Sequence, residues 1–102
     1  MIGEFEYLVL AATVRLGDNA YGAAIRRVLQ DANRTVSIGA LYTTLDRMER
    51  KGFVTTWMGE VTQARGGRAK RMVALTSKGI RAASEFYDAI RTVSQDVSWA
   101  NR

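Results

Sequence analysis

Apolar residues recur every three or four positions along the first third of the chain, which is the spacing of amphipathic helices. The first predicted helix covers residues 2–16 and ends at Gly17, a residue type that favours left-handed helix ends. The second covers residues 21–32, with its arginines opposite its apolar face. Thr35 and Val36 follow and are compatible with a very short strand. This part of the sequence therefore predicts two packed helices.

The third predicted helix covers residues 38–51 and has two faces of different character. Ser37 is a favourable N-cap, and Gly52 stands where a left-handed C-cap is expected. One face is apolar. The opposite face presents small residues, hydroxyls and arginines, namely Gly39, Ala40, Thr43, Thr44, Arg47 and Arg50. Because small residues and hydroxyls let a helix N-terminus approach another surface closely, this face is suited to the major groove of DNA.

After Gly52 the apolar period changes to two, which is the period of a β-strand. β-Branched and aromatic residues fill positions 53–58, and residues 70–75 are the predicted antiparallel partner. The most basic stretch of the chain lies between the two strands and continues into the second one. It has four cations and no acid: Arg65, Arg68, Lys70 and Arg71. Three helices followed by a basic hairpin are the order of a winged-helix fold. In that fold the third helix enters the major groove, and the hairpin reaches the adjoining backbone or minor groove.

The last predicted helix covers residues 77 to 99 and begins after Thr76, a good N-cap. Its apolar residues alternate in steps of three and four: Ala83, Phe86, Ile90, Val93 and Val97, with Tyr87 widening the stripe. This heptad-like spacing favours pairing with a second copy of the chain, although the stripe would also suit packing on its own core. We expect a homodimer, in which residues 1–76 form the DNA-binding part and residues 77–102 the dimerisation helix of the same compact unit.

The composition of the chain excludes several classes of function. Its 102 residues are enough for one domain, and the pattern predicts an α+β fold that is mostly α, a winged helix-turn-helix with a C-terminal dimerisation helix. The chain has no cysteine and no histidine, so it lacks disulfides, the commonest transition-metal ligands and the usual catalytic bases. The glycine pair in the hairpin lacks the spacing of a phosphate-binding loop. We therefore expect no enzyme activity, no metal and no cofactor.

The net charge of +5 is concentrated in one place. Residues 64–71 carry +4 of it, which leaves +1 for the rest of the chain. A dense basic spot on a nearly neutral body is suited to a polyanion such as double-stranded DNA. At the N-terminus two glutamates precede a short apolar run and no basic region does, so we expect neither a signal peptide nor a membrane anchor, and a cytoplasmic location.

Four motifs follow one another in an order that resembles the PadR family of winged-helix regulators. Tyr21-Gly22 opens the second helix, and LYTTLDRMERKGFV runs from the third helix into the strand. GGRAKR lies in the hairpin, and LTSKG leads into the last helix. The match begins with the residues GEFE near the N-terminus. Each motif alone is weak, whereas the four in sequence are specific.

The resemblance implies a homodimer, held by the last helix with help from the first, that represses transcription from a palindromic operator. It also implies DNA contacts at the positions of Ser37, Gly39, Tyr42, Thr43, Arg47, Arg65, Arg68, Lys70 and Arg71. Some relatives release DNA when a small aromatic effector binds. This chain departs from the family in its returning strand, where Met72, Val73 and Ala74 replace the usual aromatic pair and arginine. It also lacks a tryptophan on the interface side of the last helix, which does not favour an aromatic-sandwich drug site.

Two other functions are compatible with the same fold. A winged helix can serve as a protein-interaction module that binds an acidic partner with the same basic face. Such a module more often has an exposed apolar patch beside the hairpin, whereas threonines and glycines flank it here. The second alternative is a sensor whose main task is to bind a small molecule, which is also compatible with DNA binding.

Overall fold

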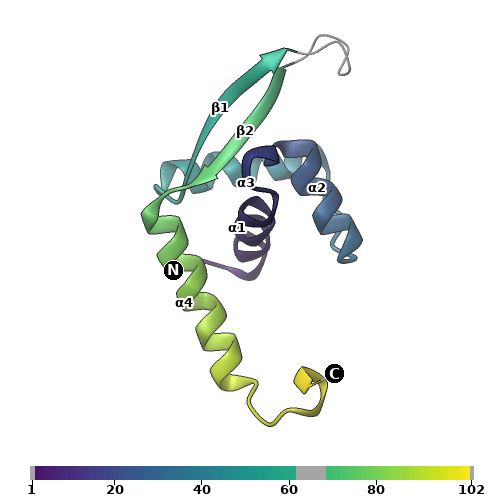
Figure 1. Ribbon diagram of the computed structural model, residues 1–102, viewed down its shortest axis with the longest axis vertical. Helices are drawn as coiled ribbons and strands as arrows, with labels where there is room; N and C mark the ends of the chain where they lie inside the picture. Colours follow the sequence, from purple (N-terminus) through teal and green to yellow (C-terminus); the bar gives the residue numbers. More distant parts are fainter. Residues whose placement is uncertain (1, 62–68, 102) are drawn as a thin grey trace.

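Three helices form a small body from which a hairpin and a fourth helix project in opposite directions (Figure 1). The computed structural model describes residues 2–61 and 69–101 of the chain. Its elements are α1 (Glu4–Leu16), η1 (Gly17–Asn19), α2 (Gly22–Asp31), α3 (Ile38–Arg50), β1 (Val54–Val61), β2 (Ala69–Leu75), α4 (Ser77–Val93) and η3 (Ser98–Asn101). The molecule measures 50 × 27 × 22 Å, and the hairpin and α4 lie at the two ends of its long axis (Figure 1). The structure confirms the expected α+β fold, which is mostly helical and has its helices and strands in the order of a winged helix.

The predicted helix boundaries rest on local capping chemistry. The Ser37 hydroxyl accepts a hydrogen bond of 3.1 Å from the backbone N–H of Ala40, and the Thr76 hydroxyl accepts one of 3.1 Å from that of Gly79. Gly52, just beyond α3, has a φ of 83°, in the left-handed region where glycine avoids a steric penalty. The N-caps and glycine helix ends predicted from the sequence are therefore confirmed.

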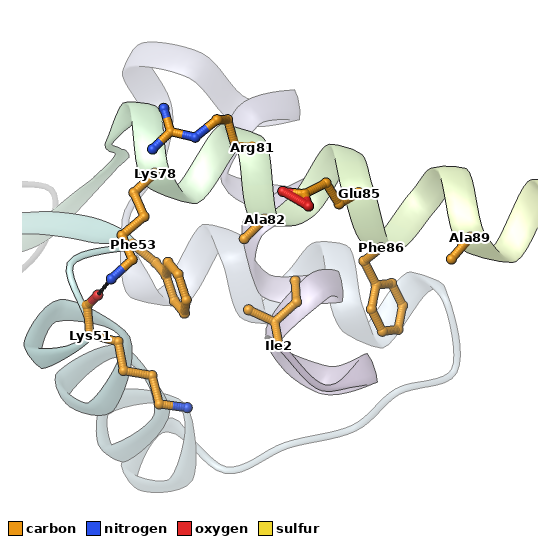
Figure 2. A pocket seen from close by; sticks show the side chains of 9 residues that line it. All are labelled: Ile2, Lys51, Phe53, Lys78, Arg81, Ala82, Glu85, Phe86 and Ala89. Carbon is orange, nitrogen blue, oxygen red and sulfur yellow. Dashed lines mark hydrogen bonds between the residues drawn. The ribbon is translucent and has the colours of Figure 1, made fainter.

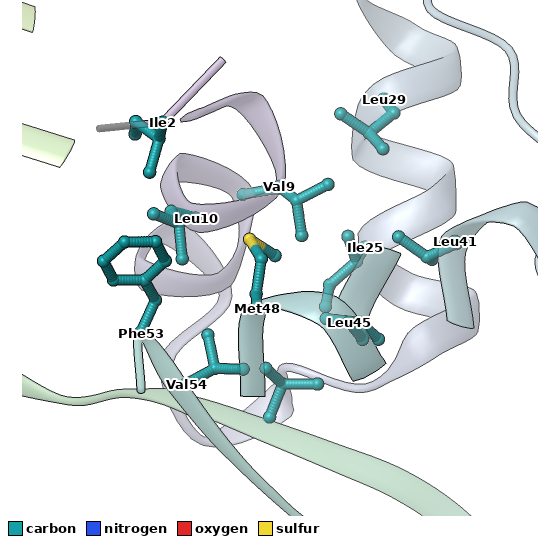
Figure 3. Packing of buried hydrophobic residues seen from close by; sticks show 12 residues of the cluster. Ile2, Val9, Leu10, Ile25, Leu29, Leu41, Leu45, Met48, Phe53 and Val54 are labelled. Atoms are coloured by element: carbon teal, nitrogen blue, oxygen red, sulfur yellow. The ribbon is translucent and has the colours of Figure 1, made fainter. Parts of the chain in front are cut away.

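The core lies where the three helices of the body meet the root of the hairpin (Figure 3). Its largest fully buried side chains are Leu10, Ile25, Leu41, Leu45, Met48, Val9 and Val54. Each such side chain contributes about 1.5–3 kcal/mol when it leaves water, so this cluster holds the α3 stripe firmly against α1 and α2. The opposite face of α3 is thereby fixed toward solvent.

The hairpin, which we call the wing, is an antiparallel pair of β1 and β2. Val54 pairs with Leu75 at its root and Met58 with Arg71 farther out, and the register shifts between Met58 and Val61. The free edge of β2 is joined to the body by a 3.0 Å hydrogen bond from the Val73 N–H to the Ala20 carbonyl. The tip, which includes Arg65 and Arg68, lies outside the described residues.

Thr35 and Val36 do not form a strand, so that expectation is wrong. The position beside β2 is taken by the chain before α2, where Tyr21 forms an isolated bridge with Met72. The Val36 carbonyl instead accepts a 2.7 Å hydrogen bond from Arg26 Nε on α2. This contact ties the loop between α2 and α3 to the outer side of α2.

α4 is shorter than the sequence predicts and packs over only part of its length. It ends at Val93 with Ser94 as its C-cap, and Asp96 then adopts a left-handed φ of 64° that a continuing right-handed helix cannot accommodate. Val97 therefore lies beyond the helix, and its assignment to the helical stripe is wrong. The body-facing half of α4 places Phe86 5.1 Å from the Tyr7 ring of α1. The remaining half extends past the body (Figure 1).

The stripe of α4 is thus divided between two environments. Ala83 and Phe86 are partly buried against the core of their own chain, as the alternative interpretation of the stripe had it. Tyr87, Ile90 and Val93 remain exposed, and Val93 is 82% accessible. Within the described parts of the chain, no helix is both long and apolar enough to span a membrane.

Candidate nucleic-acid interface

The N-terminal turns of α3 present a small, polar surface to solvent. Ser37, Gly39, Ala40 and Thr43 all lie on the solvent side of the helix. The exposed Thr43 donates a 3.0 Å hydrogen bond from its hydroxyl to the Gly39 carbonyl one turn earlier, and its hydroxyl oxygen can still accept a hydrogen bond. Ile38 is exposed beside them, an apolar contribution that the sequence pattern did not indicate. This surface has the size and chemistry needed to approach base edges.

Thr44 does not belong to this surface, and its predicted outward position is wrong. Its side chain is only 6% exposed. Position 44 falls three residues after Leu41 and four before Met48, so it lies on the same helical stripe as those core residues. No DNA contact is assigned to it.

Tyr42 lies at the edge between core and surface and packs against the start of α2. A Cβ atom on Gly22 would lie 2.6 Å from Tyr42 Cε1, so only glycine at position 22 leaves room for this ring. The Arg71 guanidinium of the wing lies 5.3 Å from the centre of the same ring. Tyr42 therefore joins α2, α3 and the wing at one point.

Arg47 faces α1 and is engaged within the molecule. Its Nε donates a 3.2 Å hydrogen bond to Glu6 Oε2, and Lys51 Nζ lies 3.4 Å from the same oxygen. Burial of the Glu6 carboxylate acts to raise its pKa, but the Gly3 N–H and the two cations together lower the pKa below its ordinary value. The carboxylate is therefore ionised and ties the C-terminal end of α3 to the start of α1.

The two described cations of the basic stretch have different surroundings. Lys70 Nζ lies 4.5 Å from the centre of the Tyr21 ring, at the place where β2 meets α2. Arg71 donates a 2.6 Å hydrogen bond to Asp46 Oδ1 of α3 and is only 18% exposed. Lys70 thus lies near the outer end of β2 as a cation beside an aromatic ring, whereas the charge of Arg71 is shared with a carboxylate.

Two large apolar side chains of the wing are exposed. Trp57 and Met58 lie on β1, and each has half or more of its surface accessible. The sequence predicted only threonines and glycines beside the basic stretch. Large apolar residues at positions 57 and 58 could have indicated an exposed apolar patch, because a two-stranded hairpin leaves both of its faces partly uncovered.

A groove runs along α4, between this helix, the chain just after α3 and the N-terminal Ile2 (Figure 2). It has a volume of about 820 Å³ and an apolar floor formed by Ile2, Phe53, Ala82, Phe86 and Ala89. Lys51, Lys78, Arg81 and Glu85 complete its lining. Lys78 Nζ donates a 2.8 Å hydrogen bond to the Lys51 carbonyl, which links the start of α4 to the end of α3. No cluster of potential metal ligands occurs among residues 2–61 and 69–101.

Comparison with known proteins places this arrangement in a family. Residues 10–85 match the family described as the transcriptional regulator PadR-like family. A PadR-like transcription factor from Bacteroides fragilis is 25% identical, with a TM-score of 0.71 over 94% of this chain and 88% of that one. A PadR family regulator from Clostridium difficile is 22% identical, with a TM-score of 0.76 over 98% of this chain and 100% of that one.

A PadR-like regulator from Bacillus cereus is 20% identical, with a TM-score of 0.73 over 96% of this chain and 91% of that one. No protein of curated function matches the sequence. The family match covers most of the chain, and these structures share its fold and are transcription regulators, not enzymes. This chain belongs to the PadR-like family of transcriptional regulators.

Proposed function

We propose that the protein is a cytoplasmic repressor that binds an inverted-repeat operator as a homodimer. In this proposal residues 1–76 bind DNA and residues 77–102 form the dimer. The observation that carries it is the exposed N-terminal face of α3 beside the wing, two surfaces that a winged helix applies to adjacent grooves. Membership of the PadR-like family supports the same interpretation.

The two surfaces would read different features of DNA. Ser37, Gly39 and Thr43 offer small groups and hydroxyls that reach base edges in the major groove, and Ala40 adds a methyl group. Lys70, together with Arg65 and Arg68 of the wing tip, offers long cations suited to phosphates. We therefore assign sequence preference to α3 and most of the charge-dependent affinity to the wing.

The dimer in the proposal is formed through α4. Tyr87, Ile90 and Val93 expose apolar surface on a helix that extends past the body, and contiguous apolar patches of this kind mark interfaces. A two-fold dimer presents two copies of α3 related by the same axis. Its operator should then be an inverted repeat with half-sites about one helical turn of DNA, or a multiple of it, apart.

The experiment that tests the proposal is selection of bound fragments from random DNA, followed by footprinting. We expect an inverted repeat with two protected half-sites. A single asymmetric half-site bound with full affinity would overturn the dimeric mode of recognition. Failure to enrich any sequence would instead favour a protein-interaction module, for which Trp57 and Met58 would be the apolar contacts.

Substitutions in the two surfaces should have separable effects. Thr43→Ala is expected to reduce the preference for one base pair per half-site by about 1–3 kcal/mol, because a base contact is lost, with little change in salt dependence. Lys70→Ala is expected to weaken operator and scrambled DNA equally and to flatten the slope of log affinity against log salt by about 0.9 per lost contact, hence by about 1.8 for the two protomers of the dimer. Titrations of both variants on both duplexes at two salt concentrations measure this. The reverse pattern would mean that the roles are exchanged.

A second function, sensing of a small aromatic anion, is favoured by the groove along α4. Its apolar floor suits an aromatic ring, and Lys51, Lys78 and Arg81 can neutralise a carboxylate. We propose that an aromatic carboxylate binds there and weakens DNA binding.

Calorimetry with benzoate and hydroxycinnamate measures this binding. Lys78→Gln should weaken the affinity for both anions. Arg91→Gln, on an exposed part of α4 outside the groove, should leave that affinity unchanged. Equal loss in both variants would contradict the assignment.

A further inference from the structure

We propose that Arg71 is a positioning residue that fixes the orientation of the wing relative to α3, and that it does not contact phosphate. The inference rests on the proposed function, because the orientation matters only if both surfaces meet DNA. It also departs from the role that the sequence and the family resemblance imply for this arginine. Three observations about its surroundings support it.

The first observation is that the guanidinium of Arg71 is bound to α3 from several sides. Its Nη2 lies 2.6 Å from Asp46 Oδ1 and 4.0 Å from Glu49 Oε1, and its Cζ lies 5.3 Å from the centre of the Tyr42 ring. Tyr42, Asp46 and Glu49 are four and three positions apart, so they lie on successive turns along one side of α3. A planar guanidinium that meets carboxylates and an aromatic face at once has one preferred orientation, unlike a lysine ammonium.

The second observation is that the other strand of the wing is bound to the same acidic pair. Glu49 Oε2 accepts two hydrogen bonds from Thr56 of β1, one of 3.0 Å from its N–H and one of 3.0 Å from its hydroxyl. Arg71 on β2 also lies 3.5 Å from the Thr56 hydroxyl. β2 is therefore attached to Asp46 and Glu49 and β1 to Glu49, which fixes the rotation of the hairpin about its root.

The third observation concerns charge. Asp46 and Glu49 are exposed on the helix that would enter the major groove, and their carboxylates would repel the phosphates on either side. Arg71 offsets this negative charge while it stays in place. If Arg71 turned toward a phosphate, it would leave both carboxylates uncompensated beside the DNA. The arrangement therefore favours Arg71 in its intramolecular position when DNA is bound.

Operator titrations of Arg71→Gln, Arg71→Lys and Asp46→Asn test this role. Arg71→Lys should weaken operator binding by about tenfold with an unchanged salt slope, because lysine keeps the charge but not the geometry, and Arg71→Gln should weaken it at least as much. Asp46→Asn should also weaken binding, and adding it to Arg71→Gln should cause no further loss. Lys70→Gln is the matched control, since it removes the neighbouring cation from both protomers and should flatten the salt slope by about 1.8, about 0.9 for each contact.

A phosphate contact would give the opposite results. Arg71→Lys would then bind like the wild type, and Asp46→Asn would bind more tightly. Any of these would overturn the inference.

Residual dipolar couplings of the free protein provide a readout without DNA. They should report a changed orientation of β1 and β2 relative to α3 in Arg71→Gln, and an unchanged orientation would also overturn it. If wild-type protein bound no operator, the proposed function would fail while these couplings still tested the inference.

Discussion

Ile90→Asp is expected to convert the proposed dimer into folded monomers and to weaken binding to the full operator by about 100-fold or more. Ile90 lies on the half of α4 that extends past the body, where 46% of its surface is accessible. In the proposed dimer this side chain is covered by the partner, and a carboxylate there would be buried without a counter-charge. A monomer would contact one half-site only and would lose the gain that comes from joining two half-site contacts.

Sedimentation at micromolar concentration measures the change in mass, and operator titration measures the loss of affinity. Ser84→Asp is the matched control, because it adds the same charge to an exposed position of α4 outside the apolar stripe. The thermal unfolding midpoint of Ile90→Asp at fixed concentration shows that each chain still folds. Removal of residues 84–102 should likewise give monomers or insoluble protein. A wild-type mass equal to one chain would contradict the proposed dimer.

Gly79→Ala is expected to destabilise the protein by about 2–3 kcal/mol, although alanine normally stabilises a helix relative to glycine. A Cβ atom at position 79 would clash with the Phe53 carbonyl oxygen. The obstacle is backbone, which cannot move aside as a flexible side chain would. Relief of the clash would shift α4 away from the root of β1 and strain the Thr76 cap.

Denaturant unfolding at one protein concentration measures this effect. Gly39→Ala is the matched control, because Gly39 also lies near the start of a helix but has no atom within 4 Å of the place that an added methyl group would occupy. We expect that variant to gain about 0.5–1 kcal/mol from reduced chain entropy. Equal effects at the two positions would show that helix propensity, and not contact with Phe53, decides the stability.

The features that could be predicted from sequence are those set by neighbours in the chain. The helix and strand periods, the caps at Ser37 and Thr76 and the left-handed Gly52 depend on residues a few positions apart. The end of α4 was missed because Asp96 carries no strong stop signal, and its left-handed backbone was not apparent. Thr44 was misplaced because a hydroxyl side chain at the margin of an apolar stripe can face either way.

The ion pairs of the candidate interface could not be predicted in this manner. Arg71 meets Asp46 across 25 positions of sequence, and Arg47 meets Glu6 across 41. Charge counting treats all four residues as independent, whereas the fold brings them together in pairs. For this reason charge counting groups Lys70 and Arg71 in one basic stretch, whereas their different surroundings follow only from the arrangement of α3 beside the wing.

Lys51 belongs both to the end of α3 and to the lining of the groove along α4. An anion that drew its ammonium away from Glu6 would therefore act directly on the helix proposed to read DNA. Such coupling between two ligands is reciprocal: an anion that lowers operator affinity by about tenfold must itself bind about tenfold more weakly to the DNA complex. The concentration of anion needed for a response would then rise with the fraction of protein already bound to its operator.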